Sequence, residues 1–163
     1  MDKRKLLISY GLQALAIVTL FIMFMPIAKS GNSTIVVFEQ VIKAGQWVYM
    51  EEYLFGIAGL ITTICLPILI VSLEVCKLSA VGIIKSKTVD LICYIVNIVL
   101  TSCVAGVIVN YFLGLGRTMG MNGLVLFKGP TMFKYSTAFF YLHCIFAAAM
   151  VVGACFNRTK KSK

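Results

Sequence analysis

Charged side chains are scarce in this sequence. They make up 13% of its 163 residues, about half the share of an ordinary soluble domain. Hydrophobic residues make up 60%, and four stretches contain no Asp, Glu, Lys or Arg: 6–28, 53–73, 91–116 and 135–157. A hydrocarbon core of about 30 Å is crossed by about 20 apolar residues of helix. The sequence therefore predicts an all-α membrane protein, a bundle of four transmembrane helices without a separate soluble domain.

The predicted helices cover about 6–28, 53–75, 90–114 and 135–156, joined by outer loops at about 29–52 and 115–134 within one domain spanning 1–163. The first run is longer than the 7–15 residues of a signal-peptide core, so we expect it to remain as a helix.

Basic residues indicate the orientation, because Lys and Arg are retained on the cytoplasmic side. With the N-terminus inside, ten of the fifteen lie on cytoplasmic segments: Lys3, Arg4, Lys5, Lys77, Lys85, Lys87, Arg158, Lys160, Lys161 and Lys163. We therefore expect a multi-pass protein of the cell membrane with both termini in the cytoplasm. The net charge of +9 suits the lipid bilayer, since anionic lipid attracts each nearby basic residue by about 1 kcal/mol. No nucleic-acid partner is expected.

The two outer loops contain short apolar runs. In the first loop, Ile35–Phe38 has strand propensity and follows turn-forming residues. In the second, apolar runs flank Lys128-Gly129-Pro130, a pattern that favours a hairpin, and the Gly-rich stretch 114–123 is interpreted as a mobile linker. A lone hairpin is marginal in water, so we predict a small exofacial β-sheet formed by both loops. A short amphipathic helix over 36–44 is the alternative.

This layout of four helices with a strand-bearing first outer loop is similar in topology to claudin-like tetraspan proteins. The resemblance implies only the architecture. The claudin family pairs an exofacial Trp with two disulfide-bonded cysteines, whereas the outer loops here contain no cysteine. An unrelated four-helix bundle is the other interpretation.

Histidine and paired cysteines, which often carry membrane chemistry, are rare. His143 is the only histidine and lies in the fourth helix. It suits a packing role, with a proton relay or a haem ligand as alternatives. The six cysteines lie in the helices and form no CxxC, so we interpret them as small hydrophobes. No cofactor and no metal are expected.

The third helix is the most polar of the four. Asn97 and Thr101 are four residues apart and share a face, and Asn110 lies near the outer end. Hydrogen bonds between membrane helices average about 0.6 kcal/mol, so we interpret these residues as links between helices, with a solute pathway as the alternative. Gln13 is the candidate partner of Asn97.

Acidic residues are expected in ion pairs. Glu51 and Glu52 end the first outer loop, where we predict a pair with Arg117; cation binding or acid–base catalysis is the alternative. Glu74 and Asp90 are placed at matching cytoplasmic helix ends, neutralised by nearby lysines: Lys77, Lys85 and Lys87.

These patterns favour a non-enzymatic membrane protein that acts by contact, as an accessory or scaffold subunit or an immunity-type protein. Its expected partners are the bilayer and another membrane protein or its own copies. Exposed apolar residues would form the contact surface: Val36, Phe38, Phe127 and Phe133. The alternative is an oligomeric transporter or channel for small solutes, lined by four polar residues: Asn97, Thr101, Asn110 and His143. An enzyme acting on lipid is the least favoured.

Overall fold

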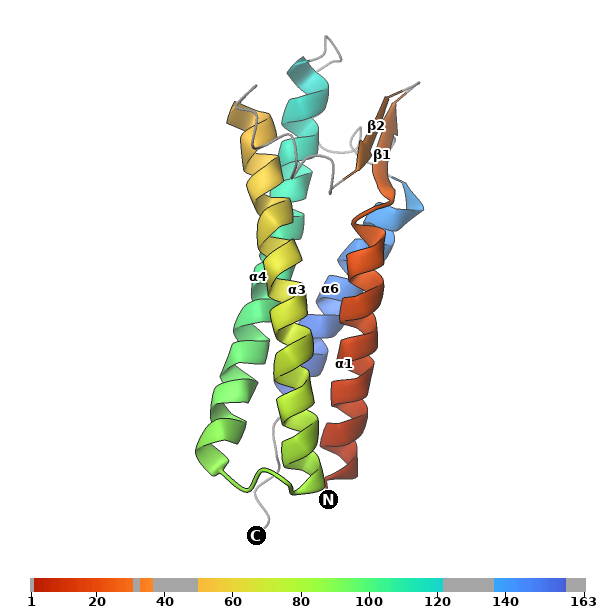
Figure 1. Cartoon of the computed structure of the whole chain (residues 1–163). Coiled ribbons are helices and arrows are strands. Elements are labelled where there is room, and N and C mark those ends of the chain that lie inside the picture. The colour runs from red at the N-terminus through yellow and green to blue at the C-terminus, as the bar shows by residue number, and fades with distance from the viewer. Residues whose placement is uncertain (1, 31–32, 37–49, 122–136, 158–163) are drawn as a thin grey trace.

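The computed structural model describes residues 2–30, 33–36, 50–121 and 137–157 (Figure 1). Its elements in chain order are α1 (Lys3–Ile22), β1 (Pro26–Ser30), β2 (Ser33–Val36), α3 (Met50–Val81), α4 (Lys87–Met121) and α6 (Ala138–Phe156). All four helices are long and apolar enough to cross a membrane. This confirms the prediction of four such helices and indicates a membrane location.

The helices form a ring in which each contacts two neighbours. Helix α1 packs against α3 and α6, and α4 packs against the same two. Chain direction alternates around the ring, so α1 begins, α6 ends and α3 turns into α4 at one end of the bundle (Figure 1). The sheet lies at the other end, and the two long helices α3 and α4 extend to its level (Figure 1).

Local signals explain where the helices begin and end. Asp2 caps α1 by accepting a hydrogen bond from the backbone N–H of Lys5 at 3.1 Å. Helix α3 stops at Gly82, whose φ of 93° is in the left-handed region that favours glycine. Helix α4 starts after Ser86, whose hydroxyl accepts from the Val89 N–H at 3.4 Å.

The first helix ends earlier than predicted. Helix α1 stops at Ile22, and residues 26–28, which the apolar run predicts as helix, belong to strand β1. The reason is Pro26, which has no backbone N–H and disfavours helical geometry at the residue before it. Strand β1 is also held by α6: the Thr137 N–H donates to the Ile27 carbonyl at 3.0 Å, and its hydroxyl donates to the Pro26 carbonyl.

The two central helices are longer than predicted. Helix α3 begins at Met50, so Glu51 and Glu52 lie in the helix instead of in a loop, and it continues past Glu74 and Lys77. Helix α4 runs to Met121 through most of the predicted mobile linker. Glycine costs only about 1 kcal/mol within a helix, and no proline interrupts this segment. The apolar runs therefore mark the membrane-compatible part of each helix and not its ends.

The sheet is a two-stranded antiparallel hairpin that lies between α1 and α3 in the chain. Ser30 faces Ser33 and Lys29 faces Thr34 in its register, with an irregularity between Pro26 and Ala28. The predicted strand around residue 35 is therefore present, but its partner is β1, part of which the sequence predicts as helix. Its predicted pairing with the second loop lies outside the described residues, and so does the alternative helix over 36–44 apart from Val36, which belongs to β2.

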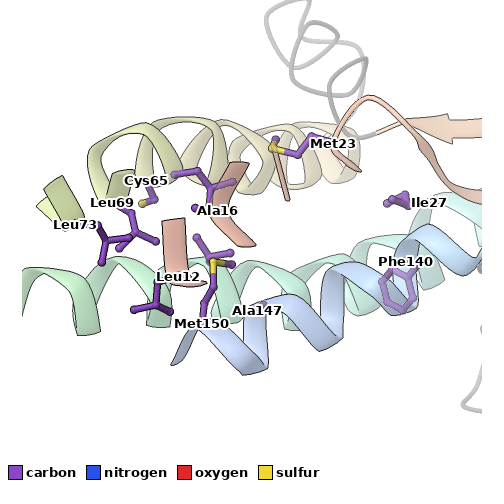
Figure 2. Packing of buried hydrophobic residues seen from close by; sticks show 12 residues of the cluster. Leu12, Ala16, Met23, Ile27, Cys65, Leu69, Leu73, Phe140, Ala147 and Met150 are labelled. Carbon is purple, nitrogen blue, oxygen red and sulfur yellow. The ribbon is translucent and has the colours of Figure 1, made fainter. Parts of the chain in front are cut away.

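An apolar core fills the ring between the two ends. Its side chains are almost fully buried and come from all four helices (Figure 2): Leu12, Ala16, Cys65, Leu66, Leu69, Leu73, Val104, Phe140, Ala147 and Met150. Gly153 of α6 permits close approach to α1, since a Cβ there would lie 2.7 Å from Leu12 Cδ2.

We predict that Gly153→Val destabilises the bundle by about 1–3 kcal/mol, because the added carbons overlap Leu12. The measurement is the free energy of unfolding in mixed detergent micelles. Gly106→Val is the matched control, because a Cβ at this exposed glycine meets no atom within 4 Å. Equal effects of the two substitutions would contradict the close α1–α6 contact.

Candidate functional site

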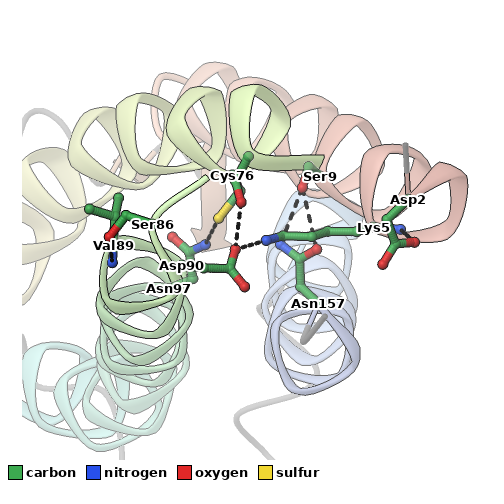
Figure 3. Close-up of polar contacts among 10 residues, drawn as sticks. Asp2, Lys5, Ser9, Cys76, Ser86, Val89, Asp90, Asn97 and Asn157 are labelled. Carbon is green, nitrogen blue, oxygen red and sulfur yellow. Dashed lines mark hydrogen bonds and ion pairs between the residues drawn. The ribbon is translucent and has the colours of Figure 1, made fainter. Parts of the chain in front are cut away.

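The end of the bundle that holds the start of α1 contains a buried ion pair across the ring. The Lys5 ammonium of α1 pairs with the Asp90 carboxylate of α4, and these helices are not neighbours in the ring (Figure 3). The Lys5 side chain is 3% exposed and that of Asp90 is 20% exposed. Asp90 also accepts from the Ser79 hydroxyl of α3 at 2.9 Å. One carboxylate thus joins three helices.

A second polar contact joins the first and last helices at the same end. Asn157 follows α6, and its side-chain amide hydrogen-bonds with the Ser9 hydroxyl at 3.2–3.3 Å, with both side chains buried (Figure 3). The Asp2 N–H donates to the Ala80 carbonyl at 2.9 Å, which joins the start of α1 to the end of α3. These contacts close the ring where the apolar core ends.

Asn97 and Thr101 lie inside the bundle, where Asn97 links two helices and the Thr101 hydroxyl bonds within its own helix. Both are fully buried. The Asn97 amide donates to the Cys76 sulfur of α3 at 3.3 Å, and the Thr101 hydroxyl donates to the Asn97 carbonyl at 2.8 Å. The suggested partner Gln13 is wrong, because its amide is engaged elsewhere on α3. Within the described residues, the Asn97 Oδ1 atom and the Ser72 hydroxyl have no hydrogen-bond partner.

A third polar group faces outward between α1 and α3. The Glu74 carboxylate accepts from the Gln13 amide at 2.6 Å and from the Lys77 ammonium at 2.5 Å. Lys77 also donates to the Gln13 side-chain oxygen at 2.7 Å and lies 4.4 Å from the centre of the Tyr10 ring. The Lys77 side chain is 10% exposed, whereas Glu74 is 53% exposed. We call these four residues the α1–α3 polar cluster: Tyr10, Gln13, Glu74 and Lys77.

The acidic residues at this end do not occupy the matching positions that the sequence suggests. Asp90 lies in the first turn of α4, whereas Glu74 lies seven residues before the end of α3. Lys77 neutralises Glu74, as expected. The partner of Asp90 is Lys5 and neither of the lysines beside it, Lys85 and Lys87, whose side chains are exposed.

His143 is buried in the row of α6 that faces the core, together with Phe140, Ala147 and Met150. The Tyr94 hydroxyl of α4 donates to the Cys155 carbonyl of α6 at 3.4 Å, and the two helices are antiparallel. From this contact, Asn97 lies three residues away along α4, and His143 lies twelve residues away along α6 in the same direction. At 1.5 Å per residue, the two residues are about 13 Å apart along the bundle. The structure therefore does not bring these two predicted site residues together.

Other predicted site residues have side chains outside the described part: Glu51, Glu52, Asn110 and Arg117, which lie on α3 and α4, and Phe38, Phe127 and Phe133. Val36 is half-buried at the end of β2. The predicted ion pair of Glu51 or Glu52 with Arg117 stays a prediction.

Sequence reasoning missed the contacts of Lys5, Ser9 and Asn157. A signal for two of them is present: buried positions of α1 recur at spacings of three and four, and the polar Lys5 and Ser9 continue the row of Leu12 and Ala16. The charge pattern alone places Lys5 only in the cytoplasmic anchor. Asn157 carries no comparable signal, because its partner is 148 residues away.

The described polar groups form structural links. Among residues 2–30, 33–36, 50–121 and 137–157, no group of three or more His, Cys, Asp and Glu side chains gathers as a metal site would. The six cysteines are free thiols. What the described arrangement does is connect helices through ion pairs and hydrogen bonds.

Comparisons with protein-family models, with curated proteins and with solved structures each found no match. The class of the protein therefore comes from its own structure, a bundle of four helices that are each long and apolar enough to span a membrane.

We predict that Asp90→Asn lowers the free energy of unfolding by about 3 kcal/mol, because Lys5 remains buried without its counter-charge. Unfolding in mixed micelles measures this loss. The double variant Lys5→Met/Asp90→Leu should recover most of it, since an apolar pair needs no counter-charge. Lys3→Met is the control, because Lys3 is exposed on the same helix. A loss no larger than that of Lys3→Met would refute a stabilising Lys5–Asp90 pair.

Proposed function

We propose that the protein is a non-enzymatic, multi-pass protein of the cell membrane that acts by contact, as an accessory or scaffold subunit or an immunity-type protein. Its helices bind another membrane protein or further copies of the same chain.

The observation that carries this proposal is how the polar groups are used. The Lys5–Asp90, Ser9–Asn157 and Asn97–Cys76 contacts all join helices of the bundle to one another. Packed side chains separate the level of Asn97 from the level of His143, among them Leu69, Val104 and Met150, each fully buried. The described interior is therefore a scaffold, and the surface of the helices remains for interaction.

That surface is apolar on every helix. Helix α4 is the most peripheral, since only 17% of its membrane-compatible window is buried, against 44% for α3. Large apolar side chains are exposed along it: Leu91, Ile92, Ile95 and Val99. A membrane protein presents such a surface to lipid and to the helices of its partners.

We also propose that the end holding the polar contacts faces the cytoplasm. Lys3, Arg4, Lys85 and Lys87 are exposed at this end, whereas the acidic Asp90 is neutralised by Lys5. Exposed basic residues beside a membrane helix favour the cytoplasmic side.

The second candidate function is an oligomeric transporter or channel for a small solute. The observation that favours it is that Asn97, Thr101 and His143 are all buried inside the ring. A route along them requires the side chains between the two levels to move, Leu69, Val104 and Met150 among them. The contact proposal requires no such opening.

We predict that the protein purified from its native membrane in mild detergent forms a complex of fixed stoichiometry, with another membrane protein or with its own copies. Light scattering and mass spectrometry of the complex measure this. The proposal fails if the purified protein, alone or as a complex of its own copies, conducts a solute into vesicles, and if Asn97→Leu and His143→Leu abolish that flux while the bundle stays folded.

For the orientation, we predict that a cysteine at Lys85 reacts with a membrane-impermeant maleimide only after the cells are permeabilised. A cysteine at Lys29 is the matched control, because this exposed residue lies on β1 at the opposite end and should react in intact cells. Both substitutions are made with the exposed Cys103 and Cys155 replaced by serine. The reverse pattern would place the termini outside.

A further inference from the structure

The α1–α3 polar cluster lies deeper along the bundle than the other charged groups at this end. Lys5 and Asp90 mark one level, because Asp90 contacts both Lys5 of α1 and Ser79 of α3, whereas Asn157 lies about one turn deeper, beside Ser9. Glu74 is five residues from Ser79 along α3, which is about 8 Å towards the centre of the bundle. Its partner Gln13 lies midway along α1.

Glu74 is an unusual group to find exposed at this depth. It lies inside the membrane-compatible window Leu60–Val81 and is 53% exposed, with exposed apolar neighbours about one turn away on the same face: Val71 and Leu78. Ionisable groups within such segments usually face the bundle interior or a protein partner, because hydrocarbon cannot solvate them. Lys77 compensates the charge, but it lies beneath the carboxylate and leaves the outer side of Glu74 accessible.

The cluster holds both an acceptor and a donor. A carboxylate only accepts hydrogen bonds, whereas the phenol of Tyr10 offers an O–H. Tyr10 is 55% exposed, and its ring contacts the same Lys77 ammonium that binds Glu74. A two-fold symmetric contact brings the same patch of both copies together, so a donor and an acceptor on one patch can satisfy each other twice.

The same face of α1 permits close approach. Ala14 lies one turn beyond Tyr10 on this face and is exposed. Small residues allow the backbones of membrane helices to come close together. Here Ala14 lies beside the polar cluster.

We propose that the α1–α3 face is the interface of a symmetric dimer of this chain, in which the Tyr10 O–H of each copy donates to the Glu74 carboxylate of the other. The dimer covers the exposed carboxylate within the membrane. This inference rests on the proposed function as a protein that acts by contact, and it names the partner as a second copy and the surface as the polar cluster with Ala14.

The test measures the dimer fraction in vesicles of neutral lipid by counting the photobleaching steps of a fluorescent label on each chain. We expect the unsubstituted protein to be dimeric and Ala14→Trp to weaken the dimer at least tenfold, because the indole fills the close contact. Val99→Trp is the matched control, since Val99 is 53% exposed on α4, away from this face, and should change the dimer less than twofold.

Glu74→Met and Tyr10→Phe test the hydrogen bond itself, because methionine has no side-chain oxygen that could accept from the Tyr10 O–H. Each should weaken the dimer, and the double variant should be no weaker than the more affected single variant, because both substitutions remove one shared interaction. Fully additive losses would overturn the pairing of these two side chains. A substitution that only perturbed the fold would also lower the unfolding midpoint in micelles, where the protein is studied as a monomer.

Cross-linking covers the case in which a Glu74 variant fails to fold. With Cys103 and Cys155 replaced by serine, oxidation of an Ala14→Cys variant should yield a covalent dimer, and a Val99→Cys variant should not. A monomer in every measurement, or a dimer broken by Val99→Trp and not by Ala14→Trp, would overturn the proposed interface. If the monomer instead binds a different membrane protein with fixed stoichiometry, the inference fails while the proposed function stands.

Discussion

The buried pair of Lys5 and Asp90 is the interaction on which this end of the fold depends. It crosses the ring between two helices that are not neighbours, and Ser79 brings a third helix to the same carboxylate. A buried ammonium without a counter-charge is strongly unfavourable, so correct packing of α1 requires α4 to be in place. The pair therefore specifies the relative rotation and register of helices whose apolar surfaces alone would accept several arrangements.

The interior of the bundle alternates between polar and apolar levels. At one end, ion pairs and hydrogen bonds join all four helices; above them, leucine, alanine and methionine side chains fill the ring. Polar contacts provide specificity because each donor needs a particular acceptor. The apolar level provides packing that does not depend on the direction of individual contacts. The α1–α3 polar cluster is the exception, because it lies on the outside where lipid offers no partner.

The number of helices and their membrane character could be predicted from sequence, because charge-free runs of the required length are seldom anything but membrane helices. The positions of helix ends could not, since Glu51 and Glu52 are compatible with a helix that continues beyond the apolar run. Glycine at 114 and 116 suggests a linker, but α4 continues through both. The break that does occur, before Pro26, lies within an apolar run that resembles uninterrupted helix.

The candidate site, too, could be predicted only in part from the sequence. The four-residue spacing of Asn97 and Thr101 predicts links between helices, and both residues are buried. Their partners depend on how α3 and α1 are rotated about their axes, which no local sequence pattern shows. The sequence therefore suggests Gln13 as the partner of Asn97, whereas Gln13 binds Glu74 and Lys77. The depth of a residue along the bundle is not visible in the sequence either. Glu74 follows an apolar run and resembles a residue at a helix end, but the polar residues of the three other helices place the end of the apolar region further along.

The hydrogen bond between Ser9 and Asn157 has a consequence for how the chain assembles during synthesis. Its two residues are 148 positions apart, so nearly the whole chain must be synthesised before the first and last helices can join. Lys5 meets Asp90 earlier, once the third of the four helices has been made. A chain with only its first three helices made would thus hold its ion pair while one side of the ring stays open, because α6 is the helix that contacts both α1 and α4 there.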